Sequence, residues 1–118
     1  MIKNFNFNLT EDQKISIKEI NDDLESGYKM FRILQGDVGS GKTIVSFVSA
    51  ANVIKSGYQT AMMAPTEILA KQHFNLAVKI FKSTNVKIEF ISGKTDSQQK
   101  LKKILKFHQK LIFCKNYF

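Results

Sequence analysis

The segment Gly36–Thr43 reads Gly-Asp-Val-Gly-Ser-Gly-Lys-Thr and constrains the fold more than any other part of the chain. It matches the P-loop pattern G-x-x-x-x-G-K-[ST] at every fixed position. In such a loop, glycines allow consecutive backbone N–H groups to surround phosphate oxygens, and the helix that follows points its positive end at them. The pattern therefore predicts a phosphate-binding loop between a strand and a helix.

Two side chains of this loop are expected to contact the phosphates and the metal ion. Lys42 is expected to reach the β- and γ-phosphates of a nucleotide, and the Thr43 hydroxyl to ligate Mg²⁺. They are the candidate catalytic residues, and Thr43 is the candidate metal ligand. The expected cofactors are ATP and Mg²⁺. The candidate nucleotide-binding residues of the loop are Gly36, Asp37, Val38, Gly39, Ser40, Gly41, Lys42 and Thr43.

Helical and extended patterns alternate along the chain, without an internal repeat and with Pro65 as the only proline. This alternation predicts an α/β fold with a parallel sheet flanked by helices. We expect helices at Thr10 to about Glu25, Ile44 to about Lys55, Glu67–Phe81 and Asp96–Phe107. We expect strands at Phe31–Gln35, Gln59–Ala64, Val86–Ile91 and Leu111–Cys114.

The apolar pattern also predicts where three of these elements lie. Phe31–Gln35 is expected to be a short buried strand, and Val86–Ile91, which alternates with charged residues, to lie nearer an edge of the sheet. The broad apolar stripe of Glu67–Phe81 predicts a deeply packed helix.

Composition limits the partners and the compartment. With 118 residues, the chain is one domain or part of one, and 43% hydrophobic against 24% charged residues is an ordinary globular balance. A formal charge of +8 favours a polyanionic partner. The single cysteine, Cys114, excludes an internal disulfide, and no stretch approaches the length of a membrane span. We expect a cytosolic monomer that does not contact membranes.

Gln13 has two interpretations that are compatible with each other. Thr10 and Gln13 have the spacing of a capping box, which satisfies backbone donors at a helix start. The Gln13 amide can also donate to and accept from one edge of adenine. The P-loop downstream favours adenine contact as an additional role.

Two further segments follow strands at the carboxyl edge of the sheet, where ligands bind in such folds. Pro65, Thr66 and Glu67 begin a helix, and Thr66 is either a plain N-cap or a contact for a nucleic-acid phosphate. Ser92 and Gly93 form either a plain turn or a second phosphate contact. The lysines that follow are typical of a solvated face, with DNA contact as the alternative: Lys100, Lys102, Lys103, Lys106 and Lys110.

Three blocks together resemble the first motor lobe of superfamily 2 helicases of the RecG type. The blocks are Phe7-x-Leu9-Thr10-x-x-Gln13, the P-loop, and Met63-Ala64-Pro65-Thr66-Glu67-Ile68-Leu69-Ala70-x-Gln72-His73. They are similar to the Q-type motif, motif I and motif Ia of that family. The similarity runs from about Phe7 to Lys106, and residues 107–118 read as a divergent tail.

The resemblance implies an ATP-dependent DNA helicase that remodels branched DNA in replication fork rescue, recombination and repair. It implies a RecA-like P-loop NTPase lobe that is incomplete, with residues 1–118 as its N-terminal part. Gln13 would contact adenine, while Pro65, Thr66, Glu67, Ser92 and Gly93 would follow the DNA backbone.

The chain departs from the family in one important respect. It contains no Asp-Glu-x-His motif, and we find no second motor lobe in it. We therefore expect a truncated or frameshifted fragment that binds nucleotide but has negligible ATPase and helicase activity. The alternative is a small P-loop nucleotide-binding protein or kinase unrelated to DNA.

Overall fold

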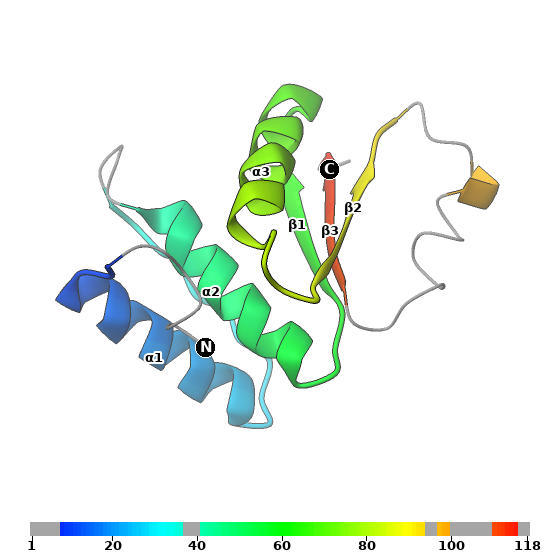
Figure 1. The fold of residues 1–118 in the computed structure, drawn as a ribbon. Coiled ribbons are helices and arrows are strands. Elements are labelled where there is room, and N and C mark those ends of the chain that lie inside the picture. Colours follow the sequence, from blue (N-terminus) through cyan, green and yellow to red (C-terminus); the bar gives the residue numbers. More distant parts are fainter. Residues whose placement is uncertain (1–7, 37–40, 94–96, 100–109, 116–118) are drawn as a thin grey trace. The chain divides into compact units, whose positions relative to one another are not determined.

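The computed structural model describes residues 8–36, 41–93, 97–99 and 110–115. The helices are α1 (Glu11–Glu25), α2 (Lys42–Lys55) and α3 (Glu67–Ile80), and the strands are β1 (Thr60–Ala64), β2 (Lys87–Ile91) and β3 (Lys110–Lys115) (Figure 1). The chain divides into two compact units, Met1–Asn52 and Val53–Phe118, and the boundary falls within α2. Among the helices of the described ranges, none is long and apolar enough to cross a membrane.

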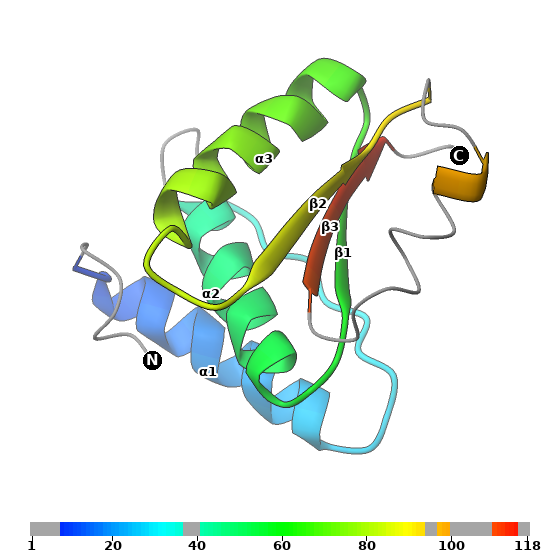
Figure 2. The ribbon, with the colours of Figure 1, turned by 45° about the vertical axis from the view of Figure 1, so that its right-hand side comes forward.

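The sheet of the second unit is parallel and has the order β1-β3-β2 (Figure 2). The central strand β3 carries Leu111, Ile112 and Phe113, all of them buried. A continuous apolar run of this kind is expected in a parallel strand that is covered on both faces. β2 lies at an edge of the described sheet, as its alternation with charged residues predicted. The parallel α/β arrangement is confirmed.

Helix α3 covers one face of this sheet and contacts all three strands (Figure 2). One row of its side chains points to the sheet: Ala70, Ala77 and the C-cap residue Phe81 are buried. Between them, the Phe74 ring packs edge-on against Phe113, with ring centroids 6.1 Å apart.

Only part of the apolar stripe of α3 is packed in this way. Leu69 and Leu76 remain 40% and 41% exposed, and Ile68 is 73% exposed. The expectation of a deeply packed helix was therefore wrong for Leu69 and Leu76. A helix on a sheet buries the row that faces the strands, and the adjoining row stays at the surface.

In the first unit, Phe31–Gln35 is not the buried strand that the sequence predicted. These residues adopt no strand, and Phe31 and Ile33 are 93% and 82% exposed. A strand exists only where a neighbour completes its ladder of hydrogen bonds, and the described sheet pairs β3 with β1 and β2 instead. An apolar run predicts the capacity to form a strand, but it does not reveal the partner.

Lys110 was expected on a solvated face, but its side chain is fully buried at the start of β3. Burial lowers the pKa of this ammonium group, and the nearby carboxylate of Glu89 opposes the shift. Among the described residues, the Lys110 ammonium has no hydrogen-bond partner. The other four lysines of that stretch lie outside the described residues. We therefore expect the buried ammonium group of Lys110 to destabilise this sheet.

Lys110→Met is expected to raise the melting temperature by a few degrees at pH 7, because it removes a buried unpaired charge and keeps a chain of similar length. The folded pKa lies below the ordinary 10.5, so the unfolded state binds more protons between the two values. Wild-type stability therefore rises with pH in that window, and the advantage of the variant shrinks. Thermal unfolding at several pH values measures both effects. Lys87→Met, at the exposed position paired with Lys110, is the control. A lower melting temperature for Lys110→Met would contradict the assignment.

Candidate functional site

The start of α1 is fixed by a reciprocal capping box, as the sequence predicted. The Thr10 hydroxyl accepts from the Gln13 backbone N–H at 3.2 Å, and Gln13 Oε1 accepts from the Thr10 N–H at 2.9 Å. Both bonds satisfy donors that the first turn of a helix leaves without intrahelical partners. The box therefore holds the Gln13 side chain in one orientation.

That orientation places the Gln13 amide against the P-loop. A Cβ added to Gly41 would lie 2.0 Å from Gln13 Nε2, so the Gln13 side chain would have to move to make room for it. Gly41 also has φ of 79°, in the left-handed region that glycine adopts at no steric cost. The backbone conformation favours glycine at this position, and a side chain there would also displace the tip of Gln13. Gln13, predicted as an adenine contact, therefore lies beside Gly41 of the loop, within the first unit.

Lys42 begins α2, and its ammonium group donates a hydrogen bond to the carbonyl oxygen of Gly36, where the motif starts. The ammonium group therefore lies between the two ends of the loop. Thr43 follows on the first turn of α2 and is partly buried. Asp37, Val38, Gly39 and Ser40 lie outside the described residues. Among the described residues, Gln13 thus lies beside Gly41, and Lys42 bonds to Gly36; their roles in nucleotide binding stay a prediction.

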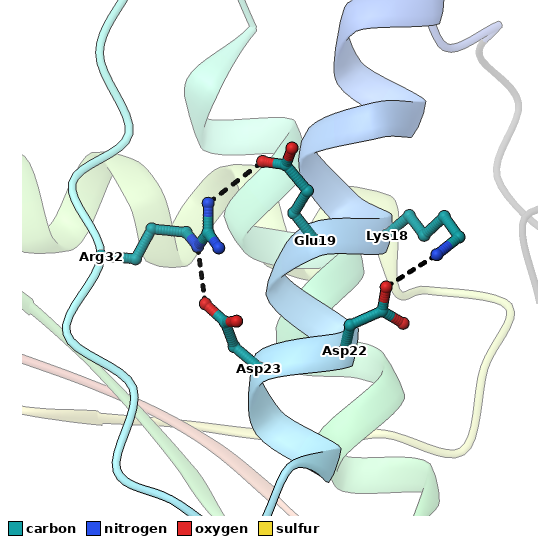
Figure 3. A network of polar contacts seen from close by, with 5 residues as sticks. All are labelled: Lys18, Glu19, Asp22, Asp23 and Arg32. Carbon is teal, nitrogen blue, oxygen red and sulfur yellow. Dashed lines mark hydrogen bonds and ion pairs between the residues drawn. The ribbon is translucent and has the colours of Figure 1, made fainter.

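A polar network, which sequence reasoning missed, ties the segment before the loop to α1. Arg32 Nε donates to Asp23 at 2.7 Å and its NH1 group to Glu19 at 3.0 Å (Figure 3). These bonds, that to Asp23 above all, raise the pKa of Arg32. Lys18 and Asp22 form a separate pair on α1 at 2.7 Å. The available signal was the spacing of Glu19 and Asp23, which places two carboxylates on one helical face.

The second group of candidate residues lies at the carboxyl edge of the parallel sheet. In the register of the strands, Ala64 at the end of β1 pairs with Lys115 of β3, and Ile91 at the end of β2 pairs with Cys114. Strands β1 and β2 therefore end at the same edge, with the end of β3 between them. The segments that follow them, beginning at Pro65 and at Ser92, leave the sheet at this edge.

Thr66 is the N-cap of α3, and its hydroxyl accepts from the Leu69 backbone N–H at 3.2 Å. The plain interpretation as a cap is therefore confirmed. It does not exclude a second contact, because a hydroxyl that accepts one bond can still donate its own hydrogen. Pro65 and Thr66 are both exposed to solvent.

The two segments at the sheet edge are joined directly. Gly93 N–H donates to Glu67 Oε1 at 2.6 Å, although the two residues are 26 positions apart. The bond connects the first residue of α3 with the turn after β2. The structure thus brings together Glu67 and Gly93, which the sequence analysis treated as separate candidates.

A cavity of about 420 Å³ opens beside this junction, between α3 and β2. The Lys71 ammonium lies over two rings there, 4.9 Å from the centroid of Phe74 and 5.0 Å from that of Phe90. Such contacts hold the cation close to the protein surface. The cavity is lined by Glu67, Ile68, Lys71, Gln72, Asn75 and Phe90.

Comparison with known proteins shows which family this chain resembles. Residues 10–116 match the DEAD/DEAH box helicase family. The ATP-dependent DNA helicase RecG of Borreliella burgdorferi is 47% identical in an alignment of 107 residues that covers 88% of this chain and 16% of that protein. RecG of Aquifex aeolicus is 46% identical over 99 residues, 84% of this chain and 12% of that protein.

A solved structure of RecG bound to a three-way DNA junction superimposes with a TM-score of 0.85 at 38% identity, over 97% of this chain and 16% of that chain. The resemblance to RecG-type helicases and the RecA-like α/β fold are confirmed. The chain spans 16% or less of the length of these relatives. Because the family match covers most of its residues, the chain belongs to the DEAD/DEAH box helicase family.

Proposed function

We propose that this chain provides a nucleotide-binding site (the nucleotide grip) and one DNA-binding site (the DNA grip) of a RecG-type motor. In such a motor, ATP hydrolysis drives the remodelling of branched DNA in fork rescue, recombination and repair. The observation that carries this proposal is its structural likeness to RecG bound to a three-way junction, with a TM-score of 0.85. The two sites described above would supply the nucleotide and DNA contacts of such a motor. The proposed partner is branched DNA, bound by a monomer in the cytoplasm.

The nucleotide grip is proposed to hold the triphosphate of ATP. Three features fit a phosphate group: Gly41 in its left-handed conformation, the N-terminus of α2 and the Lys42 ammonium group. Each offers an N–H donor or positive charge at the loop, which suits an anion. Thr43 offers the hydroxyl that would ligate Mg²⁺. When bound, Mg²⁺ supplies positive charge that stabilises the transferring phosphoryl group. Asp37, Val38, Gly39 and Ser40 would complete the ring of N–H donors.

Gln13 is proposed to contact the adenine base while it caps α1. Its Oε1 already accepts from Thr10, but a carbonyl oxygen has two lone pairs and can accept a second bond from the base. Since the same side chain lies against Gly41, base recognition and the conformation of the loop would be coupled.

The DNA grip is proposed at the carboxyl edge of the sheet, where Pro65, Thr66 and Glu67 meet Ser92 and Gly93. The hydroxyl of Thr66 and the N–H groups of the first turn of α3 can donate to a phosphate, and the helix dipole favours its negative charge. The formal charge of +8 on the whole chain favours a polyanionic partner.

These 118 residues contain no Asp-Glu-x-His sequence, the motif that would position Mg²⁺ and the attacking water. We therefore propose that this stretch contributes the binding of phosphate and DNA, and that it has negligible ATPase activity by itself. Positioned metal, water and charge together make up almost all of the catalysis of phosphoryl transfer.

The DNA grip can be tested with two substitutions at Thr66. Aspartate caps a helix as well as serine does, but its carboxylate repels a phosphate. We expect Thr66→Asp to weaken binding of a labelled three-way junction by roughly fivefold or more, and Thr66→Ser to bind like the wild type. Fluorescence anisotropy at several salt concentrations measures the affinity, which should fall steeply as salt rises.

The controls separate this effect from misfolding. Both variants should melt at similar temperatures and bind a fluorescent nucleotide equally, because the cap is retained and the nucleotide residues belong to the other unit. Equal DNA affinity of Thr66→Asp and Thr66→Ser would remove Thr66 from the DNA site. A wild-type chain that binds no DNA at low salt would refute the DNA grip.

A further inference from the structure

Glu67 is an unexpected residue in a site for DNA phosphates. Its carboxylate carries the same sign of charge as the proposed ligand, so direct contact would be repulsive. Its Oε1 is instead occupied by the backbone N–H of Gly93, at 2.6 Å. A bond between an ionised acceptor and an N–H group at this distance belongs to the stronger class of hydrogen bonds.

The position of this bond in the sheet explains why a side chain has to make it. Strand β3 lies between β1 and β2, so the backbones that leave the two outer strands are separated by roughly 9–10 Å, twice the spacing of neighbouring strands. Hydrogen bonds of the ladder cannot connect them across that gap. The side chain of Glu67 connects them, because it extends from the first residue of α3 to the turn after β2.

The bond also determines what Gly93 does. Its N–H group, which was expected to meet DNA, already donates to Glu67. The neighbouring Ser92 and the first turn of α3 are the groups that this bond brings side by side. The location of the turn, and with it the spacing between the two proposed phosphate contacts, therefore depends on Glu67.

We propose that Glu67 is a positioning residue that fastens the Ser92-Gly93 turn to the N-terminus of α3, so that the two segments form one composite edge for DNA phosphates. Glu67 itself does not contact DNA. This inference rests on the proposed DNA grip, and it replaces the direct contact that the sequence predicted for Glu67. The acidic side chain has a second benefit, since it lies in the first turn of a helix, where negative charge is stabilising.

Two substitutions separate the role of the acceptor from that of the charge. Glu67→Gln keeps a carbonyl oxygen at the same reach but removes the charge, whereas Glu67→Ala removes both. The two variants have the same net charge and lose the same interaction with the helix dipole. Any difference between them therefore reports on the hydrogen bond to Gly93.

The first measurement is hydrogen exchange of the Gly93 amide, followed by nuclear magnetic resonance on the 118-residue chain without DNA. We expect protection to be largely retained in Glu67→Gln and to fall in Glu67→Ala by roughly three- to tenfold, the range of a single net hydrogen bond. Equal exchange of Gly93 in the two variants would show that Glu67 does not hold the turn.

The second measurement is affinity for the three-way junction. We expect Glu67→Ala to bind about fivefold more weakly than Glu67→Gln, with nucleotide affinity unchanged in both. If Glu67→Ala loses the protection of Gly93 but binds at least as tightly as Glu67→Gln, the position of the turn does not serve DNA binding and the inference is overturned. If the wild type binds no DNA, the proposed function fails, and the exchange experiment still decides whether Glu67 holds the turn.

Discussion

Lys42→Ala should weaken the binding of Mg·ATP by roughly 10- to 150-fold. The ammonium group of Lys42 bonds to the carbonyl oxygen of Gly36 at the other end of the loop, and the proposed function makes it a phosphate contact. A hydrogen bond to a charged group contributes about 1.5–3 kcal/mol, which corresponds to a loss of roughly 10- to 150-fold in affinity. Titration with a fluorescent nucleotide measures this loss.

Lys55→Ala is the matched control for this substitution. Lys55 is the last residue of the same helix and is exposed, so the control changes net charge and helix composition in the same way, far from the loop. It should bind nucleotide like the wild type. Unchanged affinity in Lys42→Ala, with a melting temperature close to that of the wild type, would count against the nucleotide grip.

The parts of this fold that the sequence predicted well are those set by local interactions. The start of α1 follows from Thr10 and Gln13, three positions apart, and the start of α3 from Thr66 and its bond to Leu69. Each contact lies within one helical turn, where spacing alone determines which groups can meet. The strands Gln59–Ala64, Val86–Ile91 and Leu111–Cys114 were likewise predicted to within a residue or two at each end.

The errors concern partners that lie far away in the sequence. Phe31–Gln35 has the composition of a strand, but pairing decides whether a strand forms, and pairing is not local. Lys110 looked like part of a solvated run, although its place at the start of a central strand buries it. Charge and pattern cannot reveal such burial without the order of the strands.

The candidate site shows the same limit. The P-loop pattern indicated Gly41 and Lys42, and the structure places Gln13 beside them. No spacing rule connects Glu67 with Gly93, because their contact depends on the intervening strand and on the angle at which α3 leaves the sheet. The positions of residues within one motif were predictable from spacing, whereas the contact between two motifs required coordinates.

Gly41→Ala is expected to weaken nucleotide binding by roughly tenfold or more and to lower the melting temperature. A side chain at φ of 79° costs about 1–2 kcal/mol, because Cβ then approaches the following carbonyl oxygen. The new Cβ would also lie 2.0 Å from Gln13 Nε2, so Gln13 has to move. We expect that movement to disturb the bond of Gln13 Oε1 to Thr10 in the capping box, which contributes about 0.5–2 kcal/mol. The substitution should therefore destabilise both the P-loop and the start of α1.

Two companion variants separate the backbone strain from the clash. Gly27→Ala places a side chain at φ of 81° with nothing within 4 Å, so it should lower the melting temperature by strain alone and leave nucleotide affinity unchanged. Gly41→Ala in a Gln13→Ala background should destabilise less than it does in the wild type, because the obstructing amide is gone. If Gly41→Ala costs the same in both backgrounds, Gln13 does not rest against the loop, and the coupling between adenine recognition and the phosphate grip has no physical basis.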